Sequence, residues 1–285
     1  MLTLSIEKYK SIALEFRDLY KQNILDAIKE KQIKLGKLYT LLDEHFIDKL
    51  FLYSPDQQYK LISIVLKRYP VLENRSSQEY KALKYIFIEQ GYEKINKKDF
   101  YNKLGINSCI YCNRNYIFNL DANGHIKGQI DHFYDKASYP YLAISFYNLI
   151  PSCEGCNKVK STYNTYQNKS INPYLREEHQ LFDVRVKESG SFEYQLYDDD
   201  LLRKLLIEDI YNDGHTDILN DMYKKFYQEE TKEHFALLKQ EFQSLGISDD
   251  EIYRYLTCAY HNQDDFHKRT FSKLTKDIAK ELQLL

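Results

Sequence analysis

Two Cys-x-x-Cys pairs constrain the fold of this 285-residue chain more than any other feature of its sequence. They use four of the five cysteines, and the forty residues 113–152 separate them. A Cys-x-x-Cys turn presents two thiolates to one ion, and two such turns complete the tetrahedron of ligands that structural zinc prefers. We therefore predict a structural Zn²⁺ ion whose ligands are Cys109, Cys112, Cys153 and Cys156.

The alternative for these cysteines is a set of buried thiols, or disulfides in a secreted protein. The amino-terminal segment, MLTLSIEKYKSIALEFRD, has charges at every turn and lacks the apolar stretch of a secretory signal. No segment of the chain approaches twenty consecutive apolar residues, so we expect no membrane span. These features favour a cytoplasmic protein with reduced cysteines and therefore favour zinc.

The segment between the cysteine pairs has the pattern of two strands followed by a helix. Residues 111–120 and 125–132 are rich in aromatic and β-branched residues, and Asp-Ala-Asn-Gly between them is a turn sequence, so we predict a hairpin. A loop should follow over 135–147, and a helix should begin near Cys156. A zinc ion with four thiolates has no open position, so any chemistry must come from the residues between the cysteine pairs.

Four short sequence motifs occur in a fixed order in this segment. They are Cys-x-x-Cys at 109–112, Ile-Asp-His at 130–132, Asn-Leu-Ile-Pro-Ser-Cys-Glu-Gly-Cys at 148–156 and Asn-Lys-Val-Lys at 157–160. The pattern resembles that of the HNH endonucleases, the zinc-containing branch of the ββα-metal (His-Me finger) nucleases. This resemblance implies a metal-dependent endonuclease that hydrolyses the phosphodiester bonds of nucleic acid, with DNA favoured over RNA as the substrate.

The resemblance also implies a role for each matched residue. His132 would be the general base that takes a proton from the attacking water, because its pKa lies near the operating pH. Asp131 and Asn157 would give oxygen ligands to a catalytic Mg²⁺ or Mn²⁺ ion. Asn148 would hold the loop and orient His132 through its backbone. The last motif position is often His in this family and is Asn157 here, so we expect activity to be retained with weaker metal affinity.

Basic residues in and before this segment suggest contacts with phosphates. We predict such contacts for Lys158, Lys160 and Arg114, with Lys160 close to the amino terminus of the helix. The wider cluster is Lys94, Lys97, Lys98, Lys103, Arg114, Lys127, Lys136, Lys158, Lys160 and Lys169. Any one of these could equally be an ordinary solvated side chain, so the prediction concerns the cluster.

Helical patterns flank the predicted finger on both sides. Apolar residues recur at steps of three and four over 6–28, 37–52, 57–68, 77–90, 199–211, 216–245, 249–261 and 263–284. A second hairpin is indicated over 181–197. We therefore predict a mainly α protein with a small α+β insert: a helical region over 1–104, a zinc-stapled ββα-metal finger with its hairpin over 105–197, and a helical region over 198–285.

The net charge of −2 is low for a nuclease that finds nucleic acid unaided. The chain length, with a finger between helical segments, is similar to that of HNH effector subunits of bacterial anti-phage systems such as Septu, and to retron-associated nucleases. That similarity implies an ATPase partner and leaves tRNA open as a substrate.

Two other functions stay open. One is a stand-alone restriction-like or homing-type DNA endonuclease, and the other is a non-catalytic zinc-finger adaptor that binds nucleic acid. The sequence favours an enzyme, because an adaptor would not need His132, Asp131 and Asn157 together.

Overall fold

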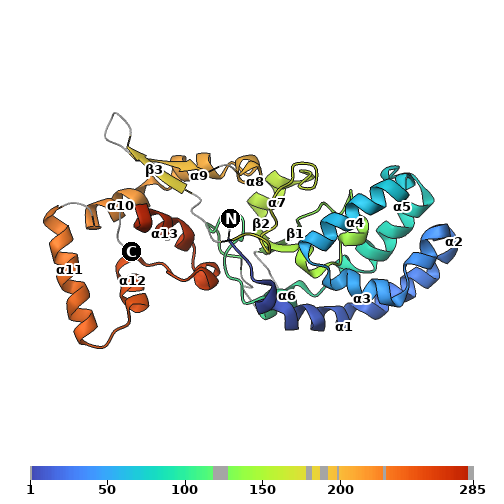
Figure 1. Ribbon diagram of the computed structural model, residues 1–285, viewed down its shortest axis with the longest axis horizontal. Coiled ribbons are helices and arrows are strands. Elements are labelled where there is room, and N and C mark those ends of the chain that lie inside the picture. Colours follow the sequence, from blue (N-terminus) through green and yellow to red (C-terminus); the bar gives the residue numbers. More distant parts are fainter. Residues whose placement is uncertain are drawn as a thin grey trace.

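The computed structural model describes residues 2–117, 128–177, 182–186, 192–197, 199–226 and 229–281. It is mainly helical, as predicted, and the described part contains two small two-stranded sheets. Figure 1 shows an elongated arrangement, with α2 and α5 at one end, the first sheet near the middle and α11 at the other end. The amino terminus lies close to the first sheet.

The amino-terminal region is a series of helices joined by short turns. The helices are α1 (Ile6–Glu30), α2 (Gln32–Leu35), α3 (Glu44–Leu52), α4 (Pro55–Arg68), α5 (Gln78–Leu83) and α6 (Lys97–Leu104). Short 3₁₀ segments η1 (Gly36–Leu41), η2 (Pro70–Glu73) and η4 (Tyr92–Lys94) and a π-helical segment η3 (Lys84–Glu89) connect them. Ser54 and Gln57 form a capping box that begins α4 with Pro55 as its first residue. The predicted helices 37–52 and 77–90 therefore exist, but each is part α-helix and part another helical form.

Aromatic packing joins these helices to the segment between the cysteine pairs. The Phe16 ring of α1 meets the rings of Phe51, Phe100 and Phe146 edge-on, with centroids 6.0, 5.9 and 5.6 Å apart. Phe146 lies just before the second strand, so a single hydrophobic core extends from the first helix into the site region.

The first sheet pairs β1 (Gly128–His132) with β2 (Leu149–Cys153) in antiparallel register, Ile130 lying opposite Pro151. Helix α7 (Glu154–Lys160) follows β2 directly. The predicted first strand, 111–120, is wrong over 111–117, because these residues form turns and a single bridge between Ser108 and Tyr116 instead of a strand. Residues 118–127 of that hairpin lie outside the described residues.

The reason is the geometry of the first Cys-x-x-Cys turn. Cys109 N donates to Asn115 O, and Asn113 N donates to Cys109 O at 2.7 Å with Asn113 in a left-handed conformation (φ 49°). These backbone groups close a tight turn around the sulfur atoms, so they are not available to a strand ladder.

The second hairpin is confirmed: β3 (Phe182–Val186) pairs antiparallel with β4 (Phe192–Leu196). The helices after it are α8 (Asp200–Lys204), α9 (Ile207–Gly214), α10 (Thr216–Phe226), α11 (Glu229–Ser244), α12 (Asp249–Thr257) and α13 (Ser272–Glu281), with a 3₁₀ segment η7 (Gln263–Lys268). The predicted helix over 199–211 is divided at Leu206, which has a positive φ of 56°. Ser248 and Glu251 form the capping box of α12.

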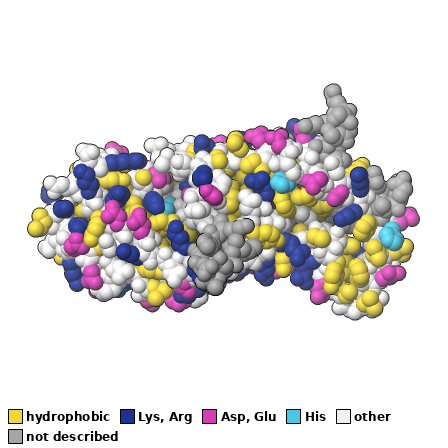
Figure 2. All heavy atoms as spheres, turned by 180° about the vertical axis from the view of Figure 1, so that it is seen from behind, with side chains coloured by type: hydrophobic (Ala, Val, Ile, Leu, Met, Phe, Trp, Pro, Cys, Tyr) yellow, Lys and Arg dark blue, Asp and Glu magenta, His cyan; other side chains and the backbone are white. Residues whose placement is uncertain are grey.

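Acidic and basic side chains are interspersed over the face drawn in Figure 2, and no single basic patch dominates that face. Within the described residues, no helix has both the length and the apolar character needed to cross a membrane.

Gly91 gives a test of the shared core. A Cβ atom at this position would lie 2.5 Å from Phe87 O and 2.6 Å from Ile144 Cγ2, distances that no packed side chain tolerates. We expect Gly91→Ala to lower the free energy of unfolding by about 1–3 kcal/mol through overpacking. Gly214→Ala is the matched control, because nothing lies within 4 Å of its added Cβ. Urea unfolding of both variants measures the effect, and equal stabilities would contradict this account of the core.

Candidate active site and metal centre

The four predicted zinc ligands converge. Their Sγ atoms all lie within 4.8 Å of one another, and all four side chains are buried. Cys112 Sγ and Cys153 Sγ are 4.0 Å apart, whereas a disulfide bond is about 2.05 Å long. Four sulfurs placed about 2.3 Å from one central ion lie about 3.8 Å from each other, so this cluster fits a tetrahedral zinc ion.

Hydrogen-bond donors point at the sulfur atoms. Arg114 N donates to Cys112 Sγ at 3.4 Å, and Asn115 Nδ2 donates to Cys153 Sγ at 3.3 Å. Such donors favour the thiolate form, whereas burial raises the pKa of the Cys109 thiol. A bound cation would resolve this conflict, because it would compensate the charge of the buried thiolates.

Distant parts of the chain hold the first cysteine turn. Tyr211 of α9 donates its hydroxyl to Cys112 O at 2.5 Å. Asn113 Nδ2 donates to Phe266 O and Arg269 O, at 3.1 and 3.2 Å. The carboxy-terminal region is thus attached to the first cysteine turn in two ways. The Tyr211 side chain binds the Cys112 carbonyl, and the carbonyls of Phe266 and Arg269 bind the Asn113 side chain.

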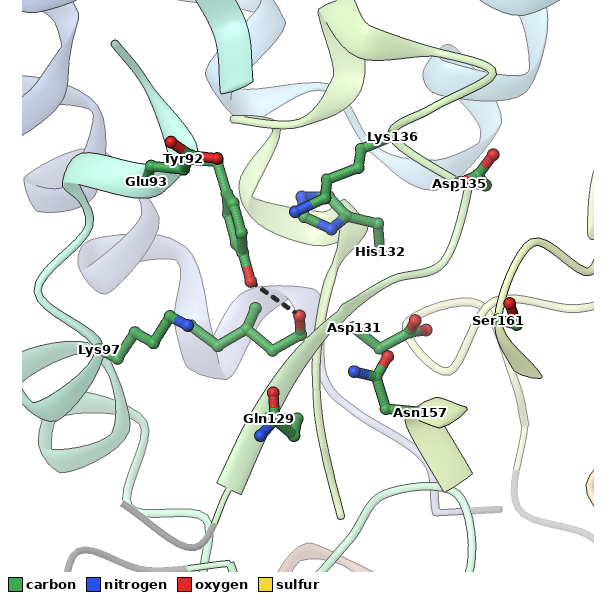
Figure 3. Close-up of a pocket in the computed structure, with 11 residues that line it drawn as sticks. Tyr92, Glu93, Lys97, Gln129, Asp131, His132, Asp135, Lys136, Asn157 and Ser161 are labelled. Carbon is green, nitrogen blue, oxygen red and sulfur yellow. Dashed lines mark hydrogen bonds between the residues drawn. The ribbon is translucent and has the colours of Figure 1, made fainter. Parts of the chain in front are cut away.

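A cleft of about 380 Å³ lies beside β1 and α7. His132, Asp131 and Asn157 all line it, together with residues of η4 and α6. Figure 3 shows the side chains of Asp131 and Asn157 pointing toward each other, with His132 farther along β1. The three residues predicted to carry the chemistry therefore share one cleft.

His132 is buried and has a defined orientation. Its Nε2 atom lies 3.1 Å from Ala143 O. A carbonyl oxygen can only accept a hydrogen bond, so Nε2 carries the proton and Nδ1 keeps its lone pair. Burial, aided by the nearby Lys136 charge, lowers the pKa of His132 to about 3. The imidazole is therefore neutral near pH 7, which is the form a general base requires. The prediction that the His132 pKa lies near the operating pH is wrong, because burial disfavours the imidazolium.

Asn148 holds the loop that orients His132. It is fully buried, its Oδ1 accepts from Tyr134 N at 2.7 Å, and its Nδ2 donates to Tyr134 O and Leu142 O at 3.1 and 3.0 Å. Its backbone carbonyl also accepts from Phe133 N at 2.9 Å, next to His132. The carbonyl that meets the His132 ring itself belongs to Ala143, the residue after Leu142.

Asp131 lies in a buried network that the sequence did not predict. Lys160 Nζ is 3.0 Å from Asp131 Oδ2 and donates to His132 O at 2.7 Å. Tyr111 donates its hydroxyl to Asp131 Oδ2 at 2.5 Å. Burial raises the pKa of the Asp131 carboxyl, and Lys160 and Tyr111 oppose that shift because they stabilise the carboxylate.

The prediction that Lys160 contacts a phosphate is therefore corrected. Its side chain has no solvent exposure and its ammonium group is occupied by Asp131 and a backbone carbonyl. Lys160 lies on the face of α7 that packs against the protein interior. The sequence could not show this, because a helix of seven residues is too short for its apolar pattern to reveal which face is buried. Lys158 is exposed and pairs with Glu154 at 2.6 Å, and neither Lys158 nor Arg114 lines the cleft, so their phosphate contacts stay predictions.

Tyr92 is one of the cleft residues that sequence analysis missed. Its ring meets the His132 ring edge-on at 4.4 Å, and its hydroxyl donates to Ile130 O at 3.0 Å. Nothing in the sequence near Tyr92 signals this contact, because tertiary packing brings η4 to β1.

Comparison with known proteins finds a similarity to a curated bacterial protein. The chain is 30% identical over 102 residues to the Septu protein PtuB of Bacillus thuringiensis. The match covers 36% of this chain. It covers about a third (35%) of the length of that curated relative. No family model matches the sequence, and no solved structure matches it.

The cysteine cluster predicts the metal content. We expect the purified chain to contain one zinc ion per molecule and Cys109→Ser to contain none, because the closed site needs four thiolates. Cys258→Ser should keep its zinc, because Cys258 is exposed and lies outside the cluster. Metal analysis by mass spectrometry checks this, and full zinc content in Cys109→Ser would remove the assigned site.

The buried ion pair predicts a stability effect. Lys160→Met leaves the Asp131 charge uncompensated in the interior, so we expect the free energy of unfolding to fall by about 3–5 kcal/mol. The double variant Lys160→Met/Asp131→Asn should recover part of that loss, since no unpaired charge remains. Urea unfolding of the single and double variants is the measurement, and an unchanged single variant would contradict the assigned pair.

Proposed function

We propose that this chain is a metal-dependent HNH-type endonuclease that hydrolyses phosphodiester bonds. The observation that carries this proposal is the meeting of His132, Asp131 and Asn157 in one cleft. β1, β2 and α7 follow one another in the strand–strand–helix order that the resemblance implies, which supports the proposal. β1 is the first strand of this unit, whereas the sequence pattern predicted it to be the second.

The chemistry of the donors suits this reaction. Water attacks the phosphorus atom, His132 Nδ1 accepts a proton from it, and the bond from phosphorus to the leaving oxygen breaks. His132 is pre-oriented for this step, because the Ala143 carbonyl holds Nε2 as the protonated nitrogen.

Asp131 and Asn157 would hold the Mg²⁺ or Mn²⁺ ion. A carboxylate offers about four lone-pair positions, and Tyr111 and Lys160 do not use all of those on Asp131. The amide oxygen of Asn157 adds a neutral ligand of the type these ions accept. When bound, such an ion supplies positive charge that stabilises the leaving oxygen. The zinc ion has a separate, structural role, since its four thiolates close its coordination shell.

We further infer that the nuclease acts in anti-phage defence. The similarity to Septu protein PtuB supports this, although it spans about a third of each chain. The net charge of −2 and the interspersed charges in Figure 2 favour recruitment by a partner, for which an ATPase of the same defence system is our proposal. We place this activity in the cytoplasm, with DNA as the substrate.

The catalytic assignment predicts the behaviour of one variant. His132→Ala should lower the cleavage rate of plasmid DNA in Mg²⁺ or Mn²⁺ by about 10²–10⁴-fold, because it removes the general base. His45→Ala is the matched control, since His45 is exposed on α3. Equal rates for wild type and His132→Ala, at equal zinc content, would reject the assignment.

The same variant separates the alternatives. A stand-alone endonuclease cuts DNA without any other protein, whereas the proposed effector cuts only when the product of the neighbouring gene is added. A non-catalytic adaptor would protect cells from phage equally well with and without His132. Phage challenge of cells that express each variant therefore decides between enzyme and adaptor.

A further inference from the structure

The cleft contains two lysines that the chemistry proposed above does not use. Lys97 is the first residue of α6, and Lys136 lies in the loop after β1. Both line the cleft with His132, and both ammonium groups lie near the ring of Tyr92, Lys136 Nζ at 4.1 Å and Lys97 Nζ at 5.8 Å from its centroid. The fold thus brings two cations from separate elements to one aromatic ring.

Tyr92 holds these two cations on different sides. Figure 3 shows Lys136 extending beside His132, while Lys97 approaches the cleft from the other side of Tyr92. The ring is held in place, because its hydroxyl donates to Ile130 O and it meets the His132 ring in an edge-type contact. Both ammonium groups therefore lie near one oriented aromatic side chain.

Neither lysine is neutralised within the described part of the chain. No carboxylate forms an ion pair with Lys97 or Lys136, although both lie near acidic residues. Of the three carboxylates that line the cleft, Asp131 is compensated by Lys160. Asp135 accepts from Ser138 N and Ser138 Oγ, both at 2.9 Å, and is thus held in its own turn. Glu93 is exposed, where solvent screens its charge.

Two cations that come from separate elements of one cleft, and that have no ion-pair partner among the described residues, suit an anion with repeated charges. A nucleic acid strand is such an anion, and lysine ammonium groups bind phosphates as point charges. We propose that Lys136 binds the phosphate that is cleaved and that Lys97 binds the neighbouring phosphate of the same strand, with Tyr92 between them. This inference rests on the proposed nuclease function. It makes the amino-terminal helical region part of the substrate site, because α6 supplies Lys97.

Substrates with one phosphate and with several phosphates test the two roles separately. We use bis(p-nitrophenyl) phosphate, which has a single phosphodiester, and a short single-stranded DNA oligonucleotide. Lys136→Gln should lower kcat/KM about 10²-fold on both, because it removes a cation from the reacting phosphate. Lys97→Gln should lower kcat/KM about tenfold more on the oligonucleotide than on bis(p-nitrophenyl) phosphate, because only the oligonucleotide has a second phosphate to bind.

The control is Lys10→Gln/Lys29→Gln, which removes two exposed lysines of α1 that do not line the cleft. It should match wild type on both substrates. If Lys97→Gln and Lys136→Gln also match wild type, or if Lys97→Gln is equally impaired on both substrates, the two-phosphate proposal is wrong while the nuclease function stands.

Binding measurements keep the proposal testable if wild type cleaves neither substrate even with the product of the neighbouring gene added, an outcome that would instead reject the proposed function. Dissociation constants for the oligonucleotide are measured against salt concentration without added Mg²⁺ or Mn²⁺. For single-stranded DNA, each lost phosphate contact lowers the slope of log K against log salt by about 0.7. Lys97→Gln/Lys136→Gln should lose about two such contacts, and a slope equal to that of wild type would overturn the inference.

Discussion

The convergence of four cysteine sulfurs is the constraint on which the site depends. It joins the turn at 109–112 to the end of β2, and through β2 it fixes both β1 and the start of α7. Asp131 and His132 are on β1, and Asn157 is on α7, so the cysteine cluster sets the distance between the two elements that hold the proposed catalytic residues. Ile110 N adds to this link, because it donates to Pro151 O at 3.1 Å.

A buried network of charges then determines what each side chain can do. Burial disfavours the charged form of Asp131, and Lys160 and Tyr111 oppose that effect. His132 lies beside this network, has no carboxylate hydrogen bond within the described residues, and meets a carbonyl with its Nε2. The carboxyl group thus has partners for its anionic form, and the imidazole is held as a neutral base, within two adjacent residues of one strand. This division of roles matches what a hydrolytic site requires.

The flanking helices are part of this arrangement. The Phe16 cluster joins α1 to Phe146, and Ser145 Oγ donates to Leu50 O at 2.7 Å, so the loop that ends at Asn148 is packed on the amino-terminal helices. Tyr92 and Lys97 come from the same region and form part of the cleft. On the other side, Tyr211 and η7 hold the first cysteine turn. Predicted boundaries at 104 and 197 therefore mark changes in secondary structure within a continuous hydrophobic core.

The sequence by itself determined the four clustered cysteines, most helices, a strand that ends at His132 and the grouping of His132, Asp131 and Asn157. These features depend on local spacing: two Cys-x-x-Cys turns, apolar periodicity, and capping residues such as Ser54 and Ser248. Tertiary structure alone decided that β1 pairs with β2, that Lys160 is buried against Asp131, that Ala143 orients His132, and that Tyr92 reaches the cleft. The physical reason is that a buried charge takes its partner, and a strand its neighbour, from segments that are distant in the sequence and are brought close only by packing.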